Sequence, residues 1–202
     1  DACLVGSEMC IRDSARGDDG DVNVVVSDGT GTLSAADLGA VTAKTTGTVT
    51  LDNAQTISGS GAELIAALKT NAATLSAAST ATVTSAVTAA VAAEIAAIAS
   101  ITLDSSGSGT ITDTLANLLN GGQTAISDDY SNARAEDTDV NVIISDGTGT
   151  IDAAKLNLIA AKTGGTVTLQ NAQTISGTGT EVTTALICLL YTSDAADDWS
   201  SG

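Results

Sequence analysis

The feature that most constrains the fold is an internal repeat at a constant offset of 118 residues. Residues 21–68 align without a gap to residues 139–186, and 32 of the 48 positions are identical. Within each copy, strand-like and helix-like patterns alternate with a unit of about 25 residues, so that Val24 is equivalent to Val49 and Val142 to Val167. A unit of this length is in the range of one β–α turn of a solenoid, in which each turn covers its neighbour's apolar face. We therefore expect an α/β fold, an elongated solenoid-like repeat with parallel strands on one side and short helices on the other.

Local signals place the elements of each copy. A β-branched run at 22–26 ends in a Ser-Asp-Gly turn, which is typical of a strand. Ser34 then precedes a short helical pattern as its N-cap, and a second strand is expected over 48–57. Ser60 and Glu63 form a capping box before another helix. Copy 2 keeps this order, with a strand at 140–144, Asp152 as a cap, a strand near 167–169, a capping box at Thr178 and Glu181, and Asn171 in the place of Asn53.

The segment between the copies predicts different elements. A stripe of aliphatic residues spaced by four and three, from Val83 through Val87 and Val91 to Ile98, favours one helix with a buried face. Residues 101–103 are typical of a strand. Thr110 and Asp113 are expected to cap a third helix, and the polar connection 120–138 is expected to be a loop.

Both ends of the chain resemble translated sequencing adapters. Residues 4–13 read Leu-Val-Gly-Ser-Glu-Met-Cys-Ile-Arg-Asp, and residues 188–197 read Cys-Leu-Leu-Tyr-Thr-Ser-Asp-Ala-Ala-Asp. These strings resemble the two transposase adapters of library-preparation kits, and the internal repeat stops at both of them. We therefore expect residues 1–14 and 188–202 to be adapter-derived and not native. The remainder is then divided into copy 1 (15–69), divergent middle repeats (70–131) and copy 2 (132–187).

Composition excludes several functional classes. Residues 15–187 contain no His, Cys, Trp, Phe or Pro and a single aromatic residue, Tyr130, so the usual general base and the strongest nucleophile are missing and we expect no enzyme. Their net charge of about −12 would repel nucleic acid. The most apolar stretch, 86–103, carries Glu94 at its centre, which disfavours membrane insertion.

The repeated phrases Ser-Asp-Gly-Thr-Gly-Thr, Thr-Gly-Thr-Val-Thr-Leu and Gln-Thr-Ile-Ser-Gly are similar to repeats of very large secreted or cell-surface proteins of bacteria, of the haemolysin-like, calcium-binding type. This resemblance implies an extracellular or cell-surface location and a non-catalytic structural or adhesive spacer. A calcium-responsive binding module is the alternative, and a glycan-acting enzyme fragment is a second one. The implied partners are neighbouring repeats of the same parent chain and a surface glycan or protein.

Asp28 and Asp146 are the candidate metal ligands. They occupy equivalent Ser-Asp-Gly-Thr-Gly-Thr turns, and stacked turns could align carboxylate and carbonyl oxygens for calcium. The competing interpretation is that an Asp-Gly pair forms a stable turn without any metal. Asn53 and Asn171, at equivalent positions, are expected to join strand and turn in a structural role.

Overall fold

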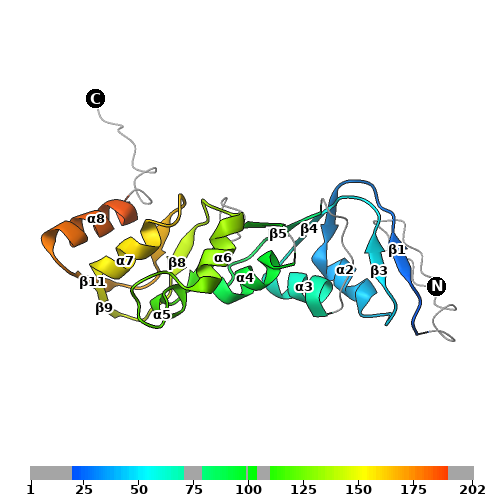
Figure 1. Cartoon of the computed structure of the whole chain (residues 1–202), viewed down its shortest axis with the longest axis horizontal. Helices are drawn as coiled ribbons and strands as arrows, with labels where there is room; N and C mark the ends of the chain where they lie inside the picture. Colours follow the sequence, from blue (N-terminus) through cyan, green and yellow to red (C-terminus); the bar gives the residue numbers. More distant parts are fainter. Residues whose placement is uncertain (1–19, 71–78, 99, 104–109, 191–202) are drawn as a thin grey trace, which may run out of the picture.

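The computed structural model describes residues 20–70, 79–98, 100–103 and 110–190. It is a mixed α/β structure whose strands pair in parallel in several small sheets. The described residues also form seven α-helices and one π-helical turn. Figure 1 shows an elongated molecule in which successive elements follow one another along the long axis.

Copy 1 contains two units, each made of two short strands followed by a helix. Its elements are β1 (Val24–Val26), β2 (Thr32–Ser34), α2 (Ala35–Thr42), β3 (Val49–Leu51), β4 (Thr56–Gly59), α3 (Gly61–Ile65) and the π-helical turn η1 (Ala66–Thr70). The N-caps predicted for copy 1 are confirmed. The Ser34 hydroxyl accepts from the Asp37 N–H at 3.3 Å, and Ser60 and Glu63 form the expected reciprocal capping box.

Copy 2 has the same order of strands and helices. Its elements are β8 (Val142–Ile144), β9 (Gly149–Asp152), α7 (Ala153–Ala160), β10 (Val167–Leu169), β11 (Gln173–Ser176) and α8 (Gly179–Leu190). Asp152 caps α7 and Thr178 forms its capping box with Glu181, as predicted. The segment expected to be adapter-derived at 1–14 lies outside the described residues, and so does 188–202 except for residues 188–190, which continue α8.

The prediction of one strand per unit was wrong, because each unit has two. Residues 48–57 form β3 and β4 with a bend at Asn53 between them, and β2 and β9 were not expected at all. The alternation of apolar and polar residues is interrupted at Asp52-Asn53, and this polar pair marks the corner that a single strand over 48–57 does not allow for. The Asn53 side chain fixes the corner by donating to the Asp28 carbonyl oxygen of the preceding unit at 2.8 Å.

The middle segment consists of β5 (Thr80–Val83), α4 (Ala89–Ala96), β6 (Ser100–Leu103), β7 (Ile111–Asp113), α5 (Leu115–Leu118) and α6 (Asp128–Glu136). The helix predicted from the aliphatic stripe is therefore wrong in its first half. Val83 ends a strand, Val87 forms an isolated bridge with Ile111, and the helix begins only after its N-cap Thr88. A spacing of four residues fits a strand period of two as well as a helix, which explains the error.

Two further predictions for this segment were also wrong. Thr110 does not cap a helix, since it precedes β7, and Asp113 ends that strand; the N-cap residue of α5 is Thr114. Residues 120–138 are not only a loop, because they contain α6. Its side chains are mostly polar, but Ser127 caps it, and Tyr130 and Ala133 are fully buried.

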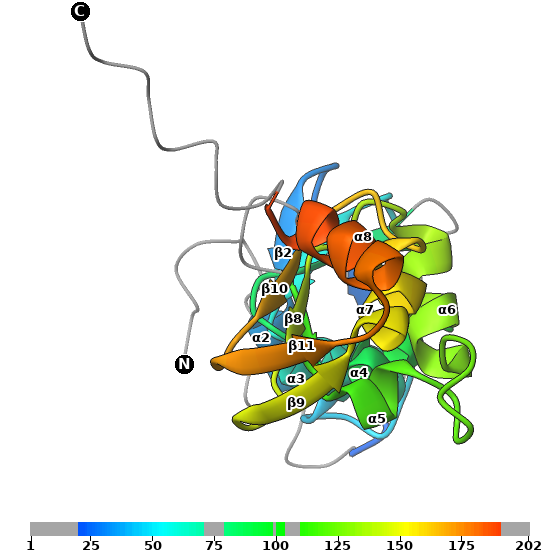
Figure 2. The same ribbon diagram turned by 90° about the vertical axis from the view of Figure 1, so that its left-hand side faces the viewer.

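The strand registers relate each residue to its equivalent in the next unit. Val24 pairs with Val49, Thr32 with Thr56, and Val142 with Val167, always in parallel. The sheet orders are β1-β3, β2-β4-β5-β6, β7-β8-β10 and β9-β11. Figure 2 looks along the long axis and shows β8 to β11 on one side and α6 and α7 on the other.

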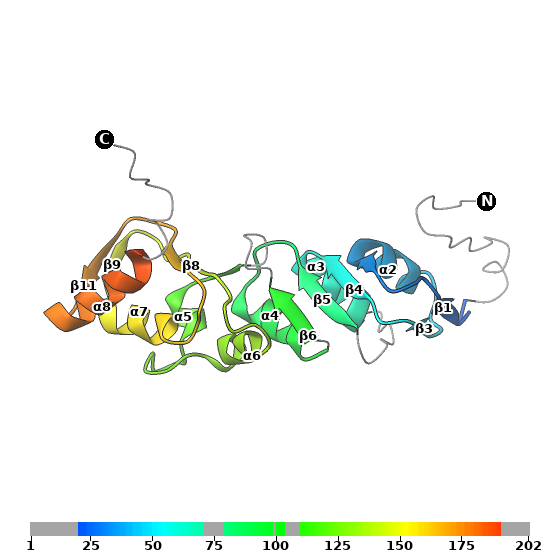
Figure 3. The ribbon, with the colours of Figure 1, turned by 90° about the horizontal axis from the view of Figure 1, so that it is seen from above.

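The core is a column of small and branched aliphatic side chains. Fully buried residues come from strands, such as Ile57, and from helices, such as Leu38, Leu64 and Leu156. Figure 3 shows α2, α3, α4 and α7 succeeding one another along the same axis. A core of this kind grows along one direction and needs no aromatic centre.

Candidate functional site

The turn that carries Asp28 is held by amide side chains of the next unit. Asn53 Nδ2 donates to the Asp28 carbonyl oxygen at 2.8 Å, and Gln55 Nε2 donates to the same oxygen at 3.2 Å. Gln55 also reaches the carbonyl oxygen of Gly29 at 3.4 Å. The carbonyl oxygens of this turn are therefore used in joining two units.

The turn that carries Asp146 repeats these contacts in copy 2. Asn171 Nδ2 donates to the Asp146 carbonyl oxygen at 2.8 Å, and Gln173 Nε2 donates to it at 3.1 Å. The structural role predicted for Asn53 and Asn171 is thus confirmed. The residue of the next unit that contacts each Asp turn has an amide side chain, Asn53 or Asn171, and not a second carboxylate.

The Asp146 carboxylate has a further role that Asp28 lacks. Its Oδ2 accepts from the Leu115 N–H at 2.7 Å, at the N-terminus of α5, where Thr114 makes no side-chain capping bond. Asp113 acts in the same way one unit earlier, because its Oδ2 accepts from the Ala89 N–H at the start of α4 at 3.1 Å. A carboxylate at the N-terminus of a helix satisfies a free N–H and complements the helix dipole. These acidic residues therefore cap helices of the preceding unit.

Asp28 and Asp146 are not brought together. Figure 1 places β1, which precedes Asp28, at one end of the molecule and β8 and β9, which flank Asp146, towards the other. Among the described residues, no group of three or more His, Cys, Asp or Glu side chains could hold a metal ion. Calcium at these two turns stays a prediction.

A cleft of about 320 Å³ lies beside Asp146, between the β8–β9 turn, α5 and α7. Its polar lining includes Gln123, Lys155 and Gln173, and the Lys155 ammonium donates to Gln123 Oε1. Gln123 has a left-handed backbone conformation (φ 51°), which is unfavourable for a non-glycine residue. The surrounding contacts stabilise this conformation. The cleft can offer hydrogen bonds to a polar ligand, but its lining contains no nucleophile paired with a base.

Sequence reasoning missed this cleft. Lys155 replaces Asp37 of copy 1, and such a charge reversal between otherwise similar copies is a signal that could have drawn attention to it. The partner Gln123 could not have been found, because it comes from the divergent middle segment and contacts Lys155 only in the folded chain.

Among the residues that the structure describes, the pKa values of Glu63 and Tyr130 are shifted, and both shifts have structural causes. The backbone N–H and the hydroxyl of Ser60 bond the exposed Glu63 carboxylate and lower its pKa. Burial raises the pKa of Tyr130 to about 12, against a smaller opposing effect of Arg134. Within the described part of the chain, the Tyr130 hydroxyl has no hydrogen-bond partner. Neither the Glu63 carboxylate nor the Tyr130 hydroxyl has the pKa or the partners of a catalytic acid or base.

The most regular polar contacts are those that join one unit to the next. Asn23 Oδ1 accepts from the N–H and the hydroxyl of Thr48, both at 2.8 Å, and Asn141 does the same to Thr166 in copy 2. The Thr45 hydroxyl donates to the Val22 carbonyl oxygen at 2.5 Å, and Thr163 repeats this bond to Val140. Polar residues shared by the two copies therefore bind units to each other.

Comparison of the chain with protein-family models, curated proteins and solved structures finds no match. In the described ranges, no helix combines the length and the apolar character needed to cross a membrane.

Proposed function

We propose that the chain is a run of β–α solenoid turns serving as a non-catalytic spacer or adhesive segment of a secreted or cell-surface protein. The observation that supports this most is the recurrence of the same inter-unit contacts in both copies. Val24 pairs with Val49 and Val142 with Val167, and the same Asn, Thr and Gln side chains join the units in each case. In this proposal the shared residues maintain stacking.

The chemistry of the side chains agrees with this role. Carboxylates that could serve as catalytic acids or bases are instead engaged in capping helices, as those of Asp113 and Asp146 illustrate. The aliphatic core extends along one axis, so it confers stiffness and length without forming a deep, enclosed site. The acidic surface, with a net charge of −17 for the whole chain, keeps such a rod soluble.

The proposal predicts a rigid body with a fixed end-to-end distance. Spin labels would be attached at two exposed positions, with Lys44→Cys and Thr180→Cys, after Cys3, Cys10 and Cys188 are changed to Ser. Pulsed electron paramagnetic resonance should give one narrow distance distribution. A broad distribution like that of a flexible Gly/Ser linker of equal length would contradict the proposal.

A second experiment tests the spacer role on a cell surface. The chain would be placed between a cell-surface anchor and a fluorescent binding module, and the Gly/Ser linker would replace it in the control. The distance between the module and a membrane dye should be narrowly distributed with the chain and broad with the linker. Equal distributions would remove the spacer role.

A further inference from the structure

The chain contains a single Asn-Gly pair, at Asn120 and Gly121. Its eight other Asn residues precede Val, Ala or Leu. The Cγ atom of an Asn side chain is open to attack by the main-chain nitrogen of the following residue, and glycine hinders this attack least because it has no Cβ atom. Asn120-Gly121 is therefore the place in the chain at which such a reaction meets the least steric resistance.

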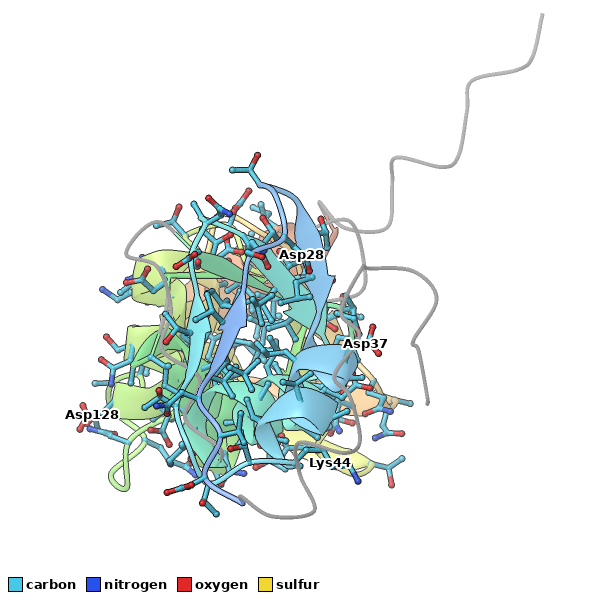
Figure 4. The ribbon with its side chains drawn as sticks, turned by 90° about the vertical axis from the view of Figure 1, so that its right-hand side faces the viewer. Asp28, Asp37, Lys44 and Asp128 are labelled. Atoms are coloured by element: carbon cyan, nitrogen blue, oxygen red, sulfur yellow. The ribbon has the colours of Figure 1, made fainter. Side chains whose placement is uncertain are left out.

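The pair lies in the turn between α5 and α6, on the surface of the molecule. Asn120, Gly121 and Gly122 are exposed, and a Cβ atom at Gly121 would meet nothing within 4 Å. Figure 4 shows Asp128, the first residue of α6 and thus just beyond this turn, on the periphery of the molecule. Water and hydroxide therefore reach both residues of the pair.

Two main-chain donors polarise the side-chain carbonyl group of Asn120. The Thr124 N–H donates to Asn120 Oδ1 at 3.0 Å, and the Ala125 N–H donates to the same oxygen at 3.3 Å. Addition of a nucleophile at Cγ places negative charge on this oxygen, and preorganised N–H groups stabilise such a charge in the manner of an oxyanion hole. The folded turn therefore lowers the barrier to attack at Cγ.

The attacking and the leaving nitrogen atoms form no hydrogen bonds that would have to break first. In the described part of the chain, neither the Gly121 N–H nor the side-chain NH2 group of Asn120 donates to another group. The main chain around them is fixed, because the Gln123 N–H donates to the Asn120 carbonyl oxygen at 2.7 Å and the Asn120 N–H donates to the Ala125 carbonyl oxygen at 2.9 Å. The turn thus holds a reactive pair without using its two nitrogen atoms.

We propose that Asn120 is a site of spontaneous deamidation. The Gly121 nitrogen loses its proton to hydroxide and bonds to Cγ, and the side-chain nitrogen takes up a proton and leaves as ammonia, which closes a succinimide ring. Water then opens this ring at one of its two carbonyl groups. Opening at the main-chain carbonyl gives isoaspartate, and opening at the side-chain carbonyl gives aspartate. Water is the only co-reactant.

The two products differ in their effect on the cleft beside Asp146. Isoaspartate adds one CH2 group to the main chain inside the turn that the bond between Asn120 and Gln123 closes, whereas aspartate leaves the main chain unchanged and keeps an oxygen for the Thr124 N–H. Gln123 adopts its left-handed conformation in this turn and accepts from the Lys155 ammonium in the cleft. Isoaspartate therefore separates Gln123 from Lys155, an irreversible change with age that goes beyond the proposed spacer role and does not depend on it.

The test follows the intact mass of the full chain during incubation at neutral and at alkaline pH. The mass of the wild type should rise by the difference between water and ammonia. The rise should be faster at alkaline pH, because the Gly121 nitrogen must lose its proton. Peptide mapping with electron-transfer dissociation should place the change at Asn120 and show isoaspartate beside aspartate.

Two variants of neighbouring glycines form a matched pair, since neither glycine has a positive φ. Gly121→Ala should slow deamidation about tenfold or more, because the added methyl group hinders ring closure. Gly122→Ala is the control: its Cβ would lie 3.6 Å from Thr124 Oγ1, an ordinary contact, and it should react at the rate of the wild type. The folded wild type should also react at least as fast as the wild type in concentrated urea, in which the Thr124 and Ala125 donors are lost.

The inference is overturned if the mass of the wild type stays constant at alkaline pH, if Gly121→Ala reacts as fast as Gly122→Ala, or if the folded chain reacts more slowly than the unfolded one. Cleavage of the chain after Asn120 in place of the mass increase would overturn it as well. For the cleft, the nuclear magnetic resonance signals of Gln123 and Lys155 should shift in the isoaspartate form, isolated by ion exchange, and stay in place in Asn120→Asp. Unchanged signals in the isoaspartate form would refute the link between the turn and the cleft.

Discussion

Gly165 provides the sharpest test of how closely the units approach each other. A Cβ atom at this position would lie 2.6 Å from the Val140 carbonyl oxygen and closer still to that of Asp139, in the preceding unit. The Gly165→Ala variant must therefore displace one of the two backbones. Its turn makes three bonds that depend on this approach: Thr163 Oγ1 to the Val140 oxygen at 2.5 Å, Gly165 N–H to Thr163 Oγ1 at 2.9 Å, and Gly164 N–H to the Thr138 oxygen at 2.8 Å.

The magnitude follows from these bonds. At about 1 kcal/mol each, their loss lowers the free energy of unfolding by about 3 kcal/mol. The smaller conformational entropy of Ala in the unfolded chain offsets about 0.5–1 kcal/mol of this. The net loss of about 2–2.5 kcal/mol corresponds to a Tm lower by about 4–10 °C.

Urea unfolding followed by circular dichroism measures the difference. Gly147→Ala is the matched control, because its Cβ would meet nothing within 4 Å, and its effect should stay within about 0.5 kcal/mol. Gly47→Ala in copy 1 should repeat the loss, since its Cβ would meet the Val22 carbonyl oxygen at 2.5 Å. Equal stability of the Gly165→Ala and Gly147→Ala variants would refute the close approach of the units.

Three other predictions concern single side chains and the candidate metal. Because the pKa of Tyr130 is raised from its ordinary value of 10 to about 12, the free energy of unfolding should be constant below pH 10 and should fall between pH 10 and 12. Tyr130→Phe should remove this pH-dependent loss, and its stability at neutral pH should be equal to that of the wild type or higher, because the buried hydroxyl has no hydrogen-bond partner in the described part of the chain. Alkaline denaturation monitored at 295 nm measures both effects. Asp146→Ala should cost about 1 kcal/mol through the lost cap on Leu115, whereas Asp28→Ala, which removes no such cap, should cost less than about 0.5 kcal/mol in the same urea assay. Removing calcium with a chelator should leave the Tm unchanged; a rise in Tm with added calcium that Asp28→Ala or Asp146→Ala abolishes would instead favour the calcium-responsive module.

Sequence reasoning succeeded where the signal was local. The capping boxes at Ser60 and Thr178 depend on residues three apart and were found in both copies. The α/β class followed from the 25-residue unit, which reappears as the strand register of Val24 with Val49. The joining role of Asn53 could be predicted because Asn171 repeats it in the second copy.

Sequence reasoning failed where the structure depends on contacts between units. The second strand of each unit has few apolar residues and exists because it pairs with its neighbour, as Leu33 does with Ile57. Helix α6 depends on burial of Tyr130, which no local pattern reveals. Asp146 was singled out as a metal ligand, and its bond to the Leu115 N–H could not be foreseen because it joins residues 31 apart in a segment without a repeat.

The most direct test of parallel stacking is nuclear magnetic resonance detection of couplings across individual hydrogen bonds. Parallel stacking predicts couplings between the Val24 N–H and the Thr48 carbonyl, and between the Val142 N–H and the Thr166 carbonyl. Each links a residue to the unit that follows it in its own copy. Couplings that link Val24 to residues of copy 2, or an antiparallel pattern within either copy, would rule out parallel stacking of successive units.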